Sequence, residues 1–298
     1  MRTHSLFAMM TVRLLVAGPA TAQLPSAEDI AALAVDSLPG RIAMYYSQTV
    51  PAPEAADLQQ LMEACVRKYE QAITGIPPVA VAILDSATWV RALRPVYGMP
   101  HHNALSTPVV VFVPATAATI FPTGLAPQQA QRLFRVLALH ELGHQLHFAA
   151  VGLDRSELGG APPQWPVAGW YMEFVAEYFR ISCLPAPDAA LGPSDEWLRS
   201  NRPAYSLLDE AERMHEQQTA DGRPYLGTPE YWANFAWLQH VMAGAARLQY
   251  ARLGEGFVAL LHEQWQRPSR STTPMIVDDL MRSNPGLGQW LRSVGALR

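Results

Sequence analysis

The chain has 298 residues, 49% of them hydrophobic, and its 22 lysines and arginines stand against 26 aspartates and glutamates. This length and composition are typical of a globular protein with one large or two modest domains. No run of basic residues is long enough to hold a polyphosphate by counterion release, so the charge pattern argues against nucleic acid as a partner.

The N-terminal residues have the pattern of a secretory signal peptide. Arg2 and Arg13 precede the apolar segment LLVAGPA, and positions 20–22 read Ala-Thr-Ala, a small-x-small cleavage pattern. We therefore expect a signal peptide over residues 1–22, cleavage after Ala22 and a secreted or periplasmic protein. A frayed apolar terminus is the alternative, because Arg13 interrupts the hydrophobic stretch. No later segment approaches the roughly 20 apolar residues of a membrane span, so we expect none.

Helices and strands alternate in the first half of the chain. Ser26, followed by acidic residues, marks a helix start, and a longer helical pattern runs over 53–73. Two valine-rich runs bounded by proline, 77–85 and 109–115, predict strands. From residue 125 the period becomes helical again, and Gly152 is the expected stop. We expect a mixed α/β part over residues 23–152.

The second half has helical patterns almost throughout. Residues 153–169 are rich in glycine and proline and predict a loop, and a new helix begins near Trp170. Further helical patterns cover 206–218, 229–248 and 254–265, and two short ones complete the chain. We expect a mainly α-helical part over 153–298 and an α+β protein as a whole.

Two cysteines, Cys65 and Cys183, are compatible with one disulfide in an oxidising compartment. The alternative is that Cys65, which lies inside the helical pattern over 53–73, is a small buried hydrophobic residue. The spacing of the two cysteines does not decide between these possibilities.

The segment HELGHQLH, residues 140–147, has the pattern of a metal site. Residues four apart share one face of a helix, so His140 and His144 can bind one ion, and Glu141 lies within reach of a water on it. A helix with surface histidines is the alternative, but the flanking residues are apolar, and half-buried imidazoles need partners. A metzincin would carry glycine at 147 and histidine at 150, whereas this chain has His147 and Ala150.

A catalytic zinc ion normally has three protein ligands, and the third is sought on a following helix. In the segment GWYMEFVAEYF, Trp170, Glu173, Ala176 and Tyr178 match the pattern W-L-N-E-G-F-A-x-Y of the large zinc aminopeptidases. The chain therefore resembles the gluzincins, the group that includes these enzymes and thermolysin, over roughly residues 109–261. The resemblance implies that Glu173 is the third ligand of one catalytic Zn²⁺. The 28 residues between His144 and Glu173 are more than these families have.

The resemblance also implies two supporting residues. An acidic residue at the offset of Glu177 accepts the second ring N–H of a ligand histidine in thermolysin-like enzymes; a solvated carboxylate is the alternative. Tyr231, 58 residues after Glu173, corresponds to the tyrosine that stabilises the oxyanion in the aminopeptidases. Tyr225 and His240 are rivals for that role. His147 is expected to be a helix-face or loop-contacting histidine.

The implied reaction is hydrolysis of a peptide or protein substrate, with Glu141 as the general base. By the same resemblance, the strand over 109–115 would be the sheet edge that an extended peptide pairs with. Aminopeptidases carry G-x-M-E-N before the metal helix, but no acidic residue follows Gly98 and Met99 in this loop, so no exopeptidase activity is implied. His101 and His102 of the same loop either line the cleft or are exposed. The alternatives are a catalytically silent binding or scaffold protein with a peptidase fold, and a zinc hydrolase of a non-peptide amide or ester.

Overall fold

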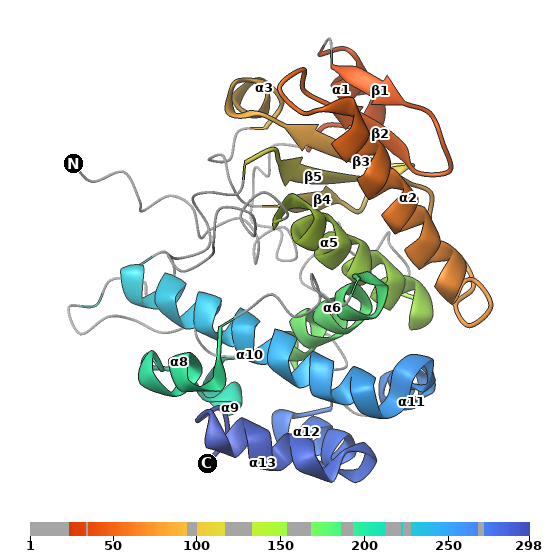
Figure 1. Ribbon diagram of the computed structural model, residues 1–298. Coiled ribbons are helices and arrows are strands. Elements are labelled where there is room, and N and C mark those ends of the chain that lie inside the picture. Colours follow the sequence, from red (N-terminus) through yellow and green to blue (C-terminus); the bar gives the residue numbers. More distant parts are fainter. Residues whose placement is uncertain are drawn as a thin grey trace. The chain divides into compact units, whose positions relative to one another are not determined.

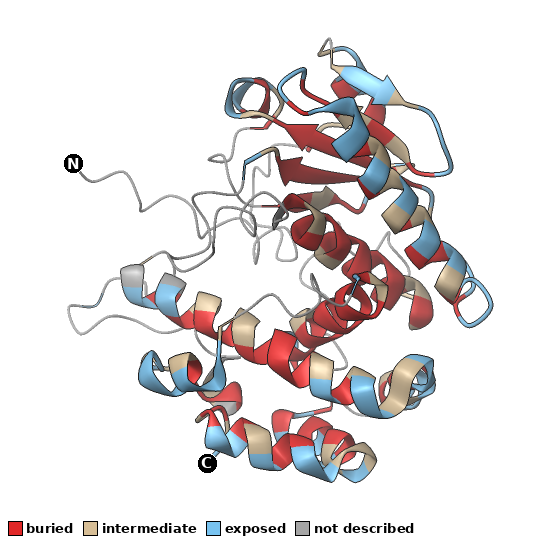
Figure 2. Cartoon of the chain, in the orientation of Figure 1, coloured by how far each residue is buried: buried red, intermediate tan, exposed pale blue. Residues whose placement is uncertain are grey.

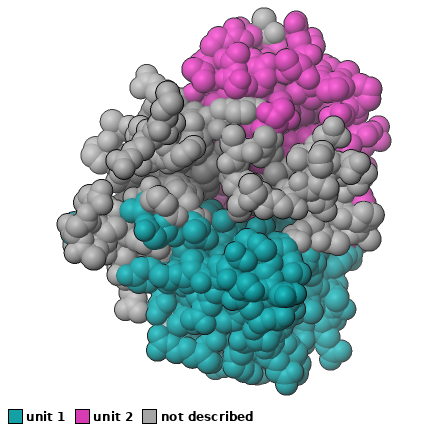
Figure 3. Space-filling view, turned by 60° about the vertical axis from the view of Figure 1, so that its left-hand side comes forward, with its two compact units in different colours: residues 1–9, 164–182, 189–298 teal, residues 10–163, 183–188 magenta. Residues whose placement is uncertain are grey.

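The structure is a computed structural model of the chain. It describes residues 24–33, 35–93, 100–116, 133–153, 168–185, 193–211, 222, 228–267 and 271–298. The predicted signal peptide and its cleavage site lie outside the described residues. The chain divides into two compact units (Figure 3). Among the described residues, unit 2 comprises 24–153 and 183–185, and unit 1 comprises 168–182 and 193–298, with the gaps just given.

Unit 2 is built around a five-stranded sheet with the strand order β1-β2-β3-β5-β4 (Figure 1). The pairs β2–β3 and β3–β5 are parallel, and the outer pairs β1–β2 and β5–β4 are antiparallel. The strands are β1 (Asp36–Leu38), β2 (Ala43–Tyr46), β3 (Val79–Leu84), β4 (His101–Asn103) and β5 (Val109–Pro114). The helices of this unit are α1 (Ala27–Ala31), α2 (Ala52–Tyr69), α3 (Ser86–Ala92) and α5 (Leu133–Ala150).

Strands β3 and β5 are buried at every position, because helices cover both faces of the sheet (Figure 2). This explains why β3 and β5 are continuous apolar runs rather than alternating ones. On one face, Ala82 and Phe112 pack in a cluster with Ile30 of α1 and Trp89 of α3. Helices α2 and α5 contact each other, and they contact β2 and β5 respectively.

Local sequence explains how several of these elements begin and end. The hydroxyl of Ser26 accepts a hydrogen bond from the backbone N–H of Asp29, whose side chain accepts from Ser26 in return, so the predicted helix start is confirmed as a capping box. Gly152 has a φ of +67° two residues after the end of α5, a conformation that glycine adopts without steric cost. The predicted stop of this helix is thereby confirmed.

Unit 1 is helical in its described part. Trp170 near the start of α6 donates a hydrogen bond to Thr273 of α12, and Tyr178 stacks on Phe257 of α11 with ring centroids 4.1 Å apart. A Cβ at Gly244 would overlap the Trp290 ring, so α10 and α13 require a glycine for their close approach. The elements are α6 (Gly169–Cys183), α8 (Asp195–Ser200), α9 (Leu208–Ala211), α10 (Pro229–Leu253), η2 (Gly254–Gly256), α11 (Phe257–Trp265), α12 (Thr273–Ser283) and α13 (Pro285–Ser293).

The predicted mixture of helices with a small sheet is confirmed, and its assignment to the gluzincin fold stays a prediction. Among the described helices, none combines the length and apolarity that a bilayer crossing demands. Sequence patterns missed β1, β2, α3, β4 and α8, which are short. The expectation that the strand over 109–115 forms the sheet edge is wrong, because β5 lies between β3 and β4, and β4 is the outermost strand on that side.

Cys65 and Cys183 form a disulfide, which decides between the two possibilities left open by the sequence. Their Cα atoms are 5.2 Å apart, and 118 positions separate them in the chain. Cys65 lies in α2, and Cys183 is the last residue of α6. Both cysteines belong to unit 2, and the bond joins the last residue of α6 to α2.

We expect the loss of this disulfide to lower the free energy of unfolding by about 2 to 5 kcal/mol, because the cross-link restricts the unfolded chain over a long loop. Urea unfolding followed by circular dichroism, with and without a reductant, measures the difference. The variant with both Cys65→Ser and Cys183→Ser is the control, since its unfolding midpoint should be the same with and without the reductant. Equal midpoints for the wild type in the two buffers would contradict the prediction.

Candidate metal centre

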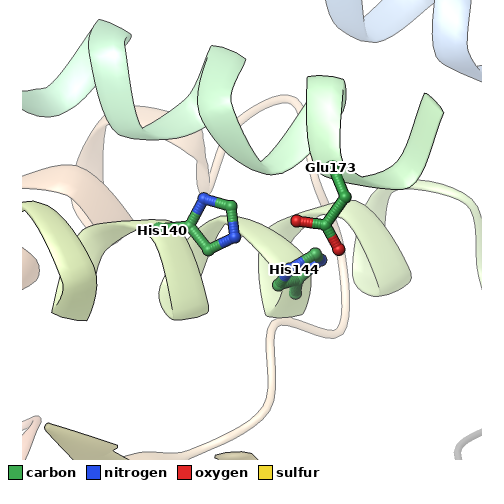
Figure 4. A group of neighbouring side chains, drawn as sticks. All are labelled: His140, His144 and Glu173. Atoms are coloured by element: carbon green, nitrogen blue, oxygen red, sulfur yellow. The ribbon is translucent and has the colours of Figure 1, made fainter. Parts of the chain in front are cut away.

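Three side chains in the described part of the chain come together as a group that could hold a metal ion. One ligand atom from each of His140, His144 and Glu173 can be chosen so that all three atoms lie within 4.8 Å of one another. Figure 4 shows the Glu173 carboxylate, from α6, directed towards the two imidazoles of α5. The structure thus brings together the three residues that were predicted from the sequence as ligands.

Helical geometry places the two histidines side by side. His140 and His144 are four residues apart in α5, and their ring centroids are 4.8 Å apart with the planes nearly perpendicular. His144 is only 5% exposed, so its imidazole has little access to bulk water. A buried imidazole needs a partner for its ring nitrogens, and a metal ion would satisfy one of them.

Glu141 lies beside the group and is held by a residue from the sheet. Glu141 is 3% exposed, and its Oε2 is 2.6 Å from Nδ1 of His102 on β4. Burial by itself would raise the pKa of Glu141, but the hydrogen bond with His102 and the charges of the neighbouring imidazoles outweigh it and lower the pKa to about 2. Because an ionised carboxylate only accepts, His102 donates its Nδ1–H. Glu141 is thus an ionised, oriented carboxylate at neutral pH.

Glu173 is held by a neutral donor. The side-chain amide of Gln239, in α10, donates a hydrogen bond of 2.7 Å to Oε2 of Glu173. Both residues belong to unit 1, and Glu173 is partly buried in α6, whose other residues from 170 to 182 are all buried. The bond restricts the carboxylate without neutralising its charge, so Glu173 remains suited to a cation.

Glu177, one turn further along α6, is paired differently. Its Oε2 accepts a 2.8 Å hydrogen bond from Nε of Arg180 and a second one from Nη2, and both side chains are buried. The guanidinium balances the buried carboxylate, so Glu177 is not the solvated carboxylate that the sequence left as an alternative. Its predicted contact with a ligand histidine stays a prediction.

The residues proposed for the oxyanion are in different environments. Tyr231 is buried near the start of α10, where its backbone N–H donates to the capping hydroxyl of Thr228 and its ring stacks on Phe235. Tyr225 lies outside the described residues. His240 packs edge-on against Trp197, and burial lowers its pKa to about 4. The role of Tyr231 stays a prediction.

His147 is fully buried, and burial lowers its pKa to about 3. It continues the face of α5 that carries His140 and His144, because it lies three residues after His144. Its partly apolar surroundings include Phe148, whose ring centroid is 6.0 Å from that of His147. His147 is therefore a buried residue of this helix face.

Sequence reasoning missed Gln239, and it placed His102 only in the cleft lining or in an exposed loop, without its contact with Glu141. His102 lies in a turn-rich segment of the sequence, and nothing in its three-residue strand marks it as a partner of Glu141. Gln239 stands inside a long helix, 66 positions after the carboxylate it contacts. Neither residue type at such a spacing has a recognisable pattern, so only the packing identifies them.

His101, the neighbour of His102, should make the fold sensitive to acid. It is 2% exposed beside Trp89, and neither ring nitrogen has a hydrogen-bond partner among the described residues. Burial, partly offset by the charge of Glu141, lowers the pKa of His101 from 6.5 to about 4. On acidification the unfolded chain therefore binds a proton at a higher pH than the folded chain. The contribution of His101 to the free energy of unfolding is fully present above pH 6.5 and is lost as the pH falls towards 4.

For this residue alone we expect a loss of about 2 kcal/mol between pH 7 and pH 5. Urea unfolding at the two pH values measures it in the wild type and in His101→Leu. The variant should lose less stability on acidification, since leucine does not titrate. The same pH dependence in both proteins would rule out a contribution from His101.

No protein-family model matches this chain, and a comparison with curated proteins finds no significant match. The inference of a function therefore rests on the chemistry of the group formed by His140, His144 and Glu173, with Glu141 beside it.

Proposed function

We propose that this protein is a zinc-dependent metallopeptidase of the gluzincin type, a hydrolase acting on peptide bonds, in the secreted or periplasmic compartment. The observation that carries the proposal is the convergence of His140, His144 and Glu173, whose ligand atoms lie within 4.8 Å of one another. The disulfide between Cys65 and Cys183 supports an oxidising compartment.

The donor set fits zinc. Two imidazoles and one carboxylate are ligands that zinc prefers, and three protein ligands leave a position open, as catalytic zinc sites do. A zinc ion held by His140, His144 and Glu173 would act as a Lewis acid towards water and a substrate carbonyl. Gln239 would keep the Glu173 carboxylate in its orientation.

Glu141 would act as the general base. It follows His140 directly in α5, so it lies next to the ligand group, and its ionised carboxylate is the state that accepts a proton. In the proposed reaction, Glu141 takes a proton from the attacking water and passes it to the leaving amine. Tyr231 is proposed to donate to the oxyanion that develops on the carbonyl oxygen.

The substrate would be an extended peptide. Strand β4 is the outermost strand of the described sheet beside β5, and one of its residues, His102, contacts Glu141. An outer strand can pair with a peptide through main-chain hydrogen bonds, which would bring a peptide bond near the general base. This location replaces β5, the strand to which the sequence assigned that role.

Metal content and hydrolysis test the proposal on the same samples. We expect about one zinc ion per purified wild-type chain by mass spectrometry, and cleavage within a library of quenched peptides. Glu173→Ala should lose both, because two imidazoles alone hold the ion weakly. Glu141→Gln should keep the zinc and lose roughly 100-fold to 10,000-fold in rate, because it removes only the base.

Glu54→Ala is the matched control, since Glu54 is an exposed glutamate in the first turn of α2, and this variant should match the wild type. Zinc retained by Glu173→Ala would refute the third ligand. A zinc-loaded wild type that cleaves no peptide would favour the scaffold alternative, unless it hydrolyses other amides or esters.

Gln239 gives a finer test of the carboxylate ligand. Replacing it with leucine removes the donor to Glu173 at similar volume, and we expect zinc affinity to fall about tenfold to a hundredfold. Competition with a chromogenic chelator measures the affinity. Gln239→Glu should lower the zinc affinity through repulsion between two carboxylates, or make the zinc affinity more dependent on pH. An unchanged affinity in Gln239→Leu would show that the hydrogen bond is not needed to orient the ligand.

A further inference from the structure

The contact between His102 and Glu141 joins two different elements of unit 2. His102 Nδ1 and Glu141 Oε2 are 2.6 Å apart, and the side chains are 14% and 4% exposed respectively. A hydrogen bond of this length between a ring N–H and a carboxylate is charge-assisted and directional. It therefore restricts the rotation of the Glu141 carboxylate.

Strand register explains why His102 and not His101 reaches α5. His102 is opposite Val111 of β5, whereas His101 is opposite Phe112, which packs with Trp89 on the other face of the sheet. Successive residues of a strand point to opposite faces. His102 consequently lies on the face that α5 covers, and His101 lies against Trp89.

The His102 ring is itself held from more than one side. Its centroid is 5.6 Å from that of His144 and 6.3 Å from that of Phe148, one turn further along α5. Pairing of β4 with β5 fixes its backbone. A donor that is packed in this way can impose an orientation on Glu141, because it has little freedom to follow the carboxylate.

We propose that His102 is a positioning residue for Glu141. By holding Oε2, it turns Oε1 towards the proton that Glu141 must accept; Oε1 has no other hydrogen bond among the described residues. The inference rests on the proposed function, since the role of Glu141 as the base belongs to it. The His102 side chain touches neither substrate nor reacting atoms in this scheme; it acts through Glu141.

The test compares three variants of the full chain. His102→Leu removes the donor at similar volume, His102→Asn keeps an N–H donor near the place of Nδ1, and His101→Leu is the matched control on the opposite sheet face. Zinc content, kcat and KM are measured with a peptide that the wild type cleaves. We expect kcat of His102→Leu to fall about tenfold to a hundredfold, with KM and zinc content unchanged. This loss is a part of the rate enhancement that a positioned general base supplies.

His102→Asn should recover most of this loss, and His101→Leu should keep the wild-type kcat. A zinc-loaded His102→Leu with kcat within twofold of the wild type would overturn the inference. A kcat of His102→Asn as low as that of His102→Leu would also overturn it, because the donor N–H would then contribute nothing and only the packing of the histidine ring would affect kcat. Loss of zinc from His102→Leu would also overturn it, since His102 would then act on the metal ligands.

A spectroscopic readout separates this inference from the proposed function. Ring ¹⁵N chemical shifts of His102 report its tautomer in the metal-free protein, and Glu141→Gln should shift them if the hydrogen bond exists. A wild type without zinc or hydrolysis would overturn the proposed function. Ring ¹⁵N chemical shifts of His102 that are the same in the wild type and in Glu141→Gln would overturn the positioning contact, even if the protein hydrolyses peptides.

Discussion

Burial of an ionised carboxylate at Glu141 is the constraint on which the arrangement of unit 2 depends. An isolated charge in the protein interior costs several kcal/mol, so a buried glutamate persists only where hydrogen bonds and opposite charges compensate. His102 provides the hydrogen bond, and the imidazoles of α5 provide the favourable potential. This in turn requires β4 to pair with β5 in the register that turns His102 towards α5.

Two glutamates one turn apart in α6 illustrate how a partner decides what a carboxylate can do. Glu177 is paired with the guanidinium of Arg180, which already neutralises it. Glu173 accepts a hydrogen bond from the neutral amide of Gln239, which leaves the charge of the carboxylate uncompensated by this donor. The same residue type on one helix thus has a structural role at one position and the properties of a metal ligand at the other.

The disulfide between Cys65 and Cys183 acts on the same helix. Glu173 lies ten positions before Cys183 in α6. The cross-link to α2 therefore restrains the C-terminal end of α6. In the proposed secreted or periplasmic compartment this restraint would persist.

Strong local signals in the sequence are enough to predict several of the elements. Continuous valine-rich runs predicted β3 and β5, the Ser26 cap predicted α1, and the spacing of His140 and His144 predicted two imidazoles on one face of a helix. These properties depend on residues within a few positions of one another. The choice of Glu173 came from resemblance to a helix pattern, and the structure brings that residue into the group.

The residues that support the site from distant positions in the chain are identified by the packing of whole elements. Strands of three residues, such as β4, carry too few positions for a periodic signal, so neither the outer position of β4 nor the orientation of His102 could be read from the chain. The pairing of Cys65 with Cys183 and of Gln239 with Glu173 joins residues 118 and 66 positions apart. Such contacts follow from how whole elements pack, because sequence spacing does not encode which side chains meet across them.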